Sequence, residues 1–210
     1  MIYLYAIADG LSDVSDIRGI VGEPLQRLDV EPFTIVAGDL STAPHIDREI
    51  LAEQDRVVRE LHDAASALLP MRFGAAYASV EEVARATKVR GAALQDALIL
   101  VRGKEQMTMR ITGGPLEPSR PAASGTDYLL KRAASATPSQ IAPLLDALKP
   151  LQRATRVETA KTAGLIATVY QLIDRGSSDD YATRVENVAR LLHGLTVRIS
   201  GPGPCYAFAS

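Results

Sequence analysis

Apolar side chains occupy consecutive positions at the start of the chain, so neither face of the first predicted strand is polar. Residues 2–8 place Ile2, Leu4 and Ala6 on one face of an extended chain and Tyr3, Tyr5 and Ile7 on the other. A strand with this pattern is typically buried on both sides. We therefore expect helices on both sides of its sheet, formed by residues 46–68 on one side and residues 79–101 on the other.

The hydrophobic period lengthens to that of a helix over residues 45–69, and Pro70 is expected to end this helix. The predicted apolar stripe contains Ile46, Ile50, Val57, Leu61, Ala65 and Leu68. Shorter β-rich runs at residues 26–29, 33–37 and 71–75 predict three further strands. The polar stretch after the first strand is long enough for a short helix. The resulting order, β-α-β-β-α-β, is that of a ferredoxin-like unit.

The same order of elements is predicted again after Gly103. Strands are expected at residues 104–111, 151–157, 165–170 and 195–200, and helices around Tyr128 and from Ser177 onwards. Between the two halves, Ser79 and Glu82 fit a capping box that starts a helical segment, which Gly91 is expected to interrupt.

The sequence therefore predicts an α+β fold with two ferredoxin-like halves, additional linking helices and an extended C-terminal tail. The expected domains are an N-terminal ferredoxin-like domain of residues 1–75 and a C-terminal ferredoxin-like domain with the tail, residues 103–210. A helical linker of residues 76–102 is expected to pack on the N-terminal domain.

Composition narrows the class of protein without identifying a function. Of the 210 residues, 47% are hydrophobic and 23% are charged, which excludes a disordered chain. The formal net charge of −2 gives no overall field that would attract nucleic acid or anionic lipid. Cys205 is the only cysteine, which excludes an intramolecular disulfide and a cysteine-rich zinc site. With no signal-peptide pattern and no apolar stretch of the roughly 20 residues that span a bilayer, we expect a cytoplasmic protein.

Several short motifs occur together in an order typical of one family. They are Tyr3-Leu4-Tyr5-Ala6, Leu69-Pro70-Met71-Arg72-Phe73-Gly74, Gly103-Lys104-Glu105, Gly125-Thr126-Asp127-Tyr128-Leu129 and Gly201-Pro202-Gly203-Pro204-Cys205-Tyr206-Ala207-Phe208. Over essentially its whole length, the chain resembles the gas vesicle protein GvpF/GvpL family. The tail differs from that family's usual Gly-Pro-Trp-Pro-Pro-Tyr, because Gly203 and Cys205 stand where the family has Trp and Pro.

The resemblance implies a non-enzymatic accessory or minor structural protein of gas vesicle assembly. Its implied partners are the hydrophobic shell protein GvpA and other gas vesicle accessory proteins, with no nucleic acid, membrane or cofactor. The structural or partner-binding candidates are Arg72, Phe73, Tyr128, Tyr206 and Phe208. The implied location is the cytoplasm and the gas vesicle.

The residue types that carry catalysis do not form a recognisable motif. His45, His62 and His193 lie on separate predicted elements without metal-ligand spacing, so capping or surface roles are favoured. Cys205 has no basic neighbour in the sequence that would lower the pKa of its thiol. We therefore expect no catalytic, metal-binding or cofactor-binding residues.

Arg72 has two interpretations, because it lies between two apolar residues at the end of a predicted strand. It could bind a partner, or it could bond backbone carbonyls and carboxylates between the two halves of the chain. The sequence favours the second interpretation, because neighbouring helices supply many carboxylates.

Two other classes of function stay open at the level of the sequence. If Met107, Met109 and Ile111 face the helices, Arg110 and Arg198 lie on the opposite, basic face of the second sheet, as in RNA-binding domains. Tyr170 is the one aromatic residue available for base stacking there, so this alternative ranks lower. A regulatory small-molecule sensor is also compatible with a ferredoxin-like fold.

The tail carries no charged side chain after Arg198 but contains two aromatic residues. Burying a Phe-sized side chain stabilises a fold by roughly 1.5–3 kcal/mol. We therefore expect the tail to fold back onto the protein in extended form between the two halves, with Tyr206 and Phe208 as its anchors. The competing interpretation is a free arm that waits for the shell protein.

Overall fold

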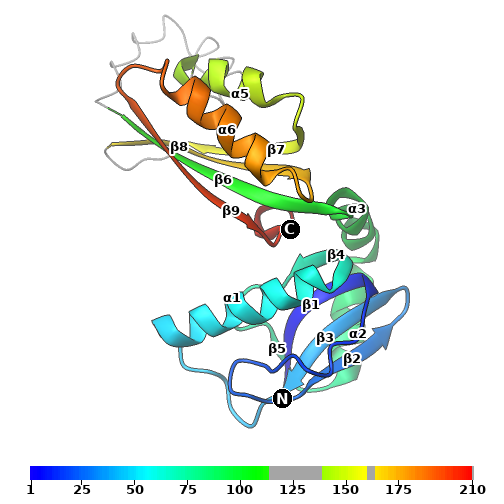
Figure 1. Cartoon of the computed structure of the whole chain (residues 1–210). Helices are drawn as coiled ribbons and strands as arrows, with labels where there is room; N and C mark the ends of the chain where they lie inside the picture. The colour runs from blue at the N-terminus through cyan, green and yellow to red at the C-terminus, as the bar shows by residue number, and fades with distance from the viewer. Residues whose placement is uncertain (114–138, 160–163, 210) are drawn as a thin grey trace, which may run out of the picture. The chain divides into compact units, whose positions relative to one another are not determined.

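The computed structural model describes residues 1–113, 139–159 and 164–209 (Figure 1). Contacts between residues divide the chain into two compact units. Unit 1 contains Met1–Glu105 together with Gly203–Ser210, and unit 2 contains Gln106–Pro202. The fold is mixed α/β with two antiparallel sheets, one in each unit.

The sheet of unit 1 has the strand order β2-β3-β1-β4, and the short strand β5 also pairs with β1. Its strands are β1 (Ile2–Leu11), β2 (Leu25–Val30), β3 (Phe33–Asp39), β4 (Ala65–Pro70) and β5 (Ala76–Tyr77). All of the pairings in this sheet are antiparallel. The longest strand, β1, is thus paired on both of its edges.

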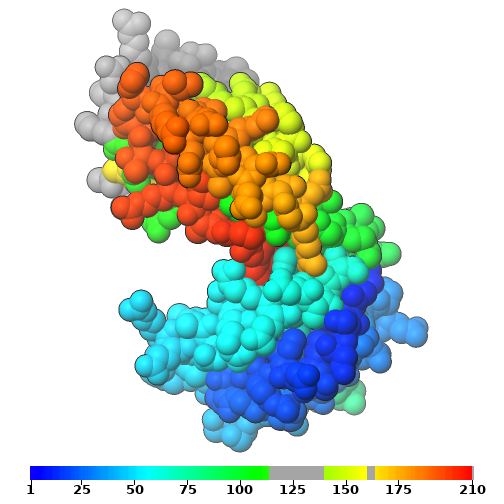
Figure 2. Space-filling view, viewed as in Figure 1, coloured from blue at the N-terminus to red at the C-terminus, as the bar shows by residue number. Residues whose placement is uncertain are grey.

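Helices cover both faces of this sheet, as the sequence predicted. They are α1 (Arg48–Asp63), α2 (Val80–Val89) and α3 (Gly91–Val101). Figure 1 shows α1 on one side of the sheet and α2 on the other, and α1 packs against β1 and β4 while α3 packs against β4. In the space-filling view, α1 forms much of the visible face of unit 1 (Figure 2).

Helices α1 and α2 each begin at a side-chain cap, and the cap of α2 is the Ser79 that the sequence identified. The Ile50 amide donates to Asp47 Oδ1 at 2.8 Å, and the Glu82 amide donates to Ser79 Oγ at 3.4 Å. Glu82 Oε2 in turn accepts a hydrogen bond from the Ala78 amide at 3.0 Å, so the capping box closes one residue earlier than in its usual form. These bonds satisfy amides that the first helical turn leaves free.

A β-bulge in β1 changes which side chains share a face. The strand is buried from Ile2 to Ala8, which confirms that both faces are covered. Its pairing with β3 shifts between Leu4 and Ala6, so the alternation restarts. Tyr3, Tyr5, Ala6 and Ala8 consequently belong to one core cluster with α1, which corrects the expected grouping of Ala6 with Ile2 and Leu4.

The end of α1 differs from the sequence prediction. The helix ends at Asp63, and Ala65–Pro70 forms β4. Residues 65–69 are apolar or small, a pattern that fits a helix as well as a strand. They form a strand because they pair with the edge of β1 that β3 leaves free. Pro70 therefore ends β4, and the strand expected at residues 71–75 is a turn.

The polar segment after β1 is also not helical. Residues 12–24 form turns and irregular backbone with a bridge between Arg18 and Pro24. Asp13 Oδ1 accepts a hydrogen bond from the Ser15 amide at 3.0 Å, and Asp13 Oδ2 accepts one from the Ser15 hydroxyl at the same distance. Local bonds of this kind compete with the hydrogen bonds of a helix.

Unit 2 has a sheet in the order β7-β8-β6-β9, with two helices on one face (Figure 1). Its described elements are β6 (Lys104–Gly113), the 3₁₀ turn η1 (Ser139–Ile141), α5 (Ala142–Leu148), β7 (Gln152–Thr159), β8 (Leu165–Asp174), α6 (Ser178–Ala189) and β9 (Leu195–Gly203). Met107, Met109 and Ile111 share a core with the apolar side chains of α5 and α6. The helix expected around Tyr128 lies outside the described residues.

The expected domain boundaries at residues 75 and 102 stay predictions. The division by contacts differs from them in grouping the tail with unit 1. None of the helices in the described residues is long and apolar enough to cross a membrane.

Candidate functional site

A turn interrupts the edge of the first sheet between β4 and β5. The Met71 amide donates to the Tyr5 carbonyl at 2.8 Å, and the Leu4 amide donates to the Ala75 carbonyl at 2.8 Å. Residues 72–74 therefore loop out while the chain on both sides of them stays hydrogen-bonded to β1. Gly74 has a φ of +83°, a conformation that side chains other than glycine rarely adopt.

Tyr3 fixes this turn from inside the protein. Its hydroxyl accepts a hydrogen bond from the Gly74 amide at 3.1 Å and donates to Gln54 Oε1 of α1 at 3.0 Å. The Phe73 ring meets the Tyr3 ring edge-on, with centroids 6.2 Å apart. Burial raises the pKa of the Tyr3 hydroxyl, so the group stays a donor at neutral pH. Phe73 is thus a packing residue of the turn, whereas Arg72 and Gly74 are exposed.

The tail packs on unit 1 through Cys205 and Phe208. Phe208 is 2% exposed and Cys205 is fully buried, and Tyr206–Phe208 forms the short 3₁₀ helix η2, which contacts β4. Tyr206 is 39% exposed. The expectation of a docked tail anchored by Phe208 is therefore confirmed. The extended form and the anchoring role of Tyr206 are wrong for this segment, because one helical turn directs Phe208 inward and leaves Tyr206 at the surface.

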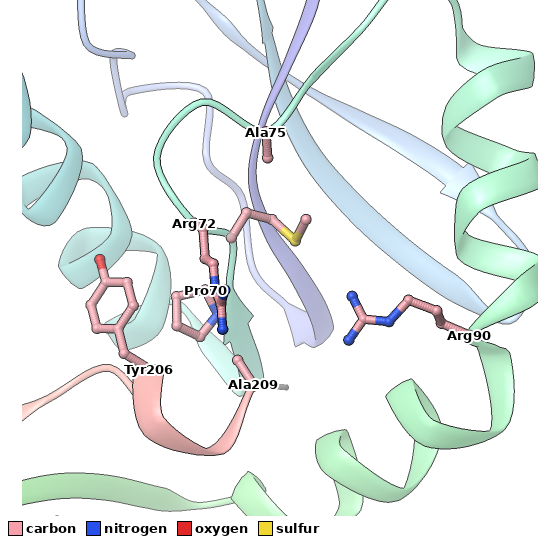
Figure 3. A pocket seen from close by; sticks show the side chains of 7 residues that line it. Pro70, Arg72, Ala75, Arg90, Tyr206 and Ala209 are labelled. Carbon is pink, nitrogen blue, oxygen red and sulfur yellow. The ribbon is translucent and has the colours of Figure 1, made fainter. Parts of the chain in front are cut away.

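The turn and the tail border one pocket, drawn in Figure 3. Its volume is about 330 Å³. It is lined by Pro70, Met71, Arg72, Ala75, Arg90, Tyr206 and Ala209. Two of the five residues singled out from the sequence, Arg72 and Tyr206, thus line one pocket, while Phe73 packs against Tyr3 and Phe208 is buried. Tyr128 lies outside the described residues.

The bonds between the two halves of the chain that the sequence favoured for Arg72 stay a prediction. The Arg72 side chain is exposed and has no hydrogen bond or ion pair to any other described residue. Arg90, at the junction of α2 and α3, is likewise exposed and without an ion pair in the described part of the chain. Sequence patterns missed Arg90, because nothing in its neighbourhood distinguishes it from other surface arginines.

Burial and a nearby carboxylate both raise the pKa of the Tyr206 hydroxyl at the rim of the pocket. Burial of the hydroxyl raises its pKa, and the charge of Asp55 on α1 raises it further, against the opposing effect of Arg59. The phenol is therefore neutral at physiological pH, and it can both donate and accept a hydrogen bond.

The histidines and the cysteine do not converge on a reactive centre. Among the described residues, no group of three or more His, Cys, Asp or Glu side chains could hold a metal ion. His62 Nε2 lies 3.1 Å from the Lys104 carbonyl oxygen, and Cys205 Sγ contacts the same oxygen at 3.9 Å. Both side chains are buried. The sequence did not predict that these two side chains contact the same carbonyl oxygen. This shared contact holds the tail close to the end of α1.

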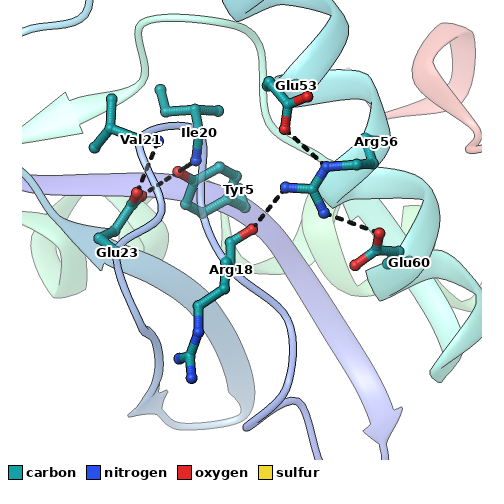
Figure 4. Close-up of polar contacts among 8 residues, drawn as sticks. All are labelled: Tyr5, Arg18, Ile20, Val21, Glu23, Glu53, Arg56 and Glu60. Carbon is teal, nitrogen blue, oxygen red and sulfur yellow. Dashed lines mark hydrogen bonds and ion pairs between the residues drawn. The ribbon is translucent and has the colours of Figure 1, made fainter.

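A second polar cluster fixes the segment that replaces the first expected helix (Figure 4). The Tyr5 hydroxyl donates to Glu23 Oε1 and accepts from the Ile20 amide at 2.9 Å, while Glu23 Oε2 accepts from the Val21 amide at 3.0 Å. A Cβ atom built on Gly38 would lie 2.5 Å from Glu23 Oε1, so glycine leaves space for the carboxylate.

Arg56 completes this cluster from α1. Its guanidinium donates to Glu53 at 2.8 Å, to Glu60 at 2.9 Å and to the Arg18 carbonyl at 3.0 Å. The bonds of Tyr5 and Arg56 connect the 18–23 segment to β1 and to α1, so the cluster holds this segment in place. We therefore assign this polar cluster a structural role.

The open face of the sheet in unit 2 has the basic residues that raised the RNA-binding alternative. Arg110 and Arg198 are exposed there. Tyr170 donates a hydrogen bond to Glu158 Oε2 at 3.1 Å, and burial together with that carboxylate raises the pKa of the tyrosine. A carboxylate beside the stacking aromatic would repel a phosphate backbone, so this face does not favour RNA.

Comparisons with known proteins give matches over the full length of the chain. A family model described as gas vesicle synthesis protein GvpL/GvpF matches residues 1–210. Gas vesicle protein F1 of Halobacterium salinarum is 22% identical over 211 residues, which cover 99% of this chain and 92% of that protein.

Two crystal structures share the fold. GvpF from Anabaena superposes with a TM-score of 0.78 at 19% identity, covering 100% of this chain and 95% of that one. GvpF from Microcystis aeruginosa also gives a TM-score of 0.78, at 17% identity, covering 100% and 98%.

Proposed function

Because the chain belongs to the GvpL/GvpF family of gas vesicle synthesis proteins, we propose that it assists gas vesicle assembly by binding the shell protein GvpA. The observation that carries this proposal is the family match over residues 1–210. A shell protein that builds a gas-facing wall must expose a large apolar surface, which associates in water unless a partner covers it. Other accessory proteins of the vesicle are the second class of partner.

We propose that this role is one of binding and not of catalysis, in the cytoplasm and at the vesicle. Two features support it: His62 and Cys205 are buried as parts of the packing between α1 and the tail, and Arg72 and Tyr206 are exposed around a pocket. Exposed arginine and tyrosine are residue types enriched in protein interfaces.

We also propose that both units are variants of the ferredoxin-like arrangement. In each unit the first strand lies between the third and the fourth, with the second at the edge. Unit 1 would then be a variant in which residues 12–24 replace the first helix. Edges and faces of such sheets offer sites for strand addition and helix docking.

The test is complementation of a gas vesicle gene cluster that lacks its own member of this family. Supplying the full-length chain should restore vesicles, seen by electron microscopy and by loss of light scattering after pressure collapse. Tagged chain should also retain co-expressed GvpA on an affinity column. Normal vesicles without the chain, together with no retention of GvpA, would overturn the proposal.

A further inference from the structure

Two guanidinium groups from different elements border the pocket of Figure 3. Arg72 belongs to the turn between β4 and β5, and Arg90 to the junction of α2 and α3. The tail contributes Tyr206 and Ala209. All of these residues belong to unit 1, so the pocket is defined within one compact unit.

Within the described residues no carboxylate is paired with Arg72 or Arg90, in contrast to three other arginines of the same unit. Arg56 is paired with Glu53 and Glu60, Arg59 with Asp55, and Arg102 with Asp9. Among the described residues, neither Arg72 nor Arg90 has an ion-pair partner, and none of the seven lining residues is acidic. Two positive charges that face one space repel each other, so a bound anion would stabilise the arrangement.

The remaining lining favours an anion carried by a polypeptide. Pro70, Met71 and Ala75 are apolar, and the half-exposed Tyr206 presents an aromatic ring at the rim. Guanidinium groups bind planar carboxylates through paired N–H donors. An apolar floor adds contact area for the side chain next to the carboxylate.

We propose that this pocket binds an aspartate or glutamate side chain, flanked by an apolar residue, of the partner polypeptide. The inference rests on the proposed function, and it names the chemistry by which the partner is recognised. Arg72 and Arg90 would bind the carboxylate, and Tyr206 would contact the flanking residue.

The first experiment measures binding of short, overlapping, fluorescently labelled peptides that together cover GvpA, using fluorescence anisotropy with the full-length chain. Peptides with an acidic residue beside an apolar one should bind, and their Asn or Gln analogues should bind about tenfold more weakly. Added salt should weaken the acidic peptides selectively, because screening acts on the charged contact. Equal binding of the acidic and amide peptides would overturn the proposal.

The second experiment changes the protein. The Arg72→Gln/Arg90→Gln double variant should bind the acidic peptide about tenfold more weakly, with little change for the amide analogue. Arg85→Gln is the matched control, because Arg85 is an exposed arginine of α2 outside the pocket, and it should bind as the wild type does. Binding that is unchanged in the double variant would overturn the proposal, as would tight binding of inorganic phosphate that displaces the peptide.

Urea unfolding of the double variant and its capture of GvpA distinguish the remaining outcomes. A double variant that unfolds at lower urea concentration with unchanged peptide binding would mean that the arginines hold the tail, which overturns the pocket proposal. Retention of GvpA by that variant would leave the proposed function intact. Arginine-dependent binding of acidic peptides without any capture of GvpA would support the pocket and overturn the proposed function.

Discussion

At the scale of single residues, the hydroxyl of Tyr5 links two otherwise separate segments. It donates to Glu23 and accepts from the Ile20 amide, so its removal leaves a carboxylate and a buried amide each short of a partner. Tyr5→Phe should lower the free energy of unfolding by about 2 kcal/mol, since a buried group left unsatisfied costs roughly 1–3 kcal/mol. Urea denaturation followed by circular dichroism measures this change.

Tyr170→Phe is the matched control for that substitution. Its hydroxyl bond to Glu158 is at the surface, where water replaces the lost partner. The expected change is within about 0.5 kcal/mol. Equal effects of the two substitutions would show that the Tyr5 cluster does not hold the segment.

The raised pKa of the Tyr5 hydroxyl predicts that the protein loses stability at alkaline pH. Burial, together with the bond to Glu23, raises the pKa of Tyr5 well above its ordinary value of 10.0. The unfolded chain therefore releases this proton at lower pH than the folded protein does. The stabilisation is fully present below about pH 10 and is lost above it, at about 1.4 kcal/mol per pH unit for each such group.

Urea midpoints measured on both sides of pH 10 test this prediction. Burial raises the pKa of Tyr181 in unit 2 as well, so both proteins should lose stability above pH 10. The wild type should lose it more steeply, because the Tyr5→Phe variant lacks the contribution of Tyr5. Parallel pH profiles for the two proteins would contradict the assignment.

At the scale of elements, Gly201 near the end of β9 combines an unusual backbone with a close approach. Its φ is +115°, and a Cβ atom there would lie 2.6 Å from the Gln106 carbonyl oxygen of β6. Gly201→Ala should therefore destabilise the protein by the roughly 1–3 kcal/mol of a strained backbone, and by more because of the steric contact. Gly22→Ala, where nothing lies within 4 Å of the Cβ atom, should have the smaller effect. Thermal unfolding compares the two variants, and a larger effect at Gly22 would contradict this reasoning.

The sequence predicted elements well where local pattern and tertiary pairing agree. The strands of unit 2 around the described core and the break between α2 and α3 are examples. Residues 65–69 were misassigned because their apolar pattern fits both a helix and a strand, and β1 provides the edge that decides. The bulge after Leu4 leaves no local signature, so the faces of β1 were grouped incorrectly.

The candidate site was predictable in part, for a similar reason. The motifs that carry Arg72, Phe73, Tyr206 and Phe208 pointed to segments that do meet in unit 1. Arg90, and the shared contact of His62 and Cys205 with Lys104, depend on residues far apart in the chain. No single-sequence pattern records contacts at such separations.

At the scale of the whole molecule, the tail is the part of unit 1 that follows unit 2 in the sequence. Deleting residues 203–210 should remove the buried Phe208 and Cys205 and destabilise unit 1, by at least the roughly 1.5–3 kcal/mol of a buried Phe side chain. Unit 2 should keep its protection against hydrogen exchange, since the deleted residues belong to unit 1. Tyr206→Ala should have a smaller effect on stability than the deletion, because Tyr206 is 39% exposed and Phe208 is 2% exposed, and a deletion as mild as that substitution would contradict the docked tail.

The late position of the tail also sets an order of events on the ribosome. Chains are made from the N-terminus, and domains generally fold as they emerge. Arg72 and Arg90 are translated early, but the pocket that they border also requires Tyr206 and Ala209, which emerge after all of unit 2. A chain interrupted before Tyr206 therefore lacks a complete pocket, so it would be unable to engage a partner through it.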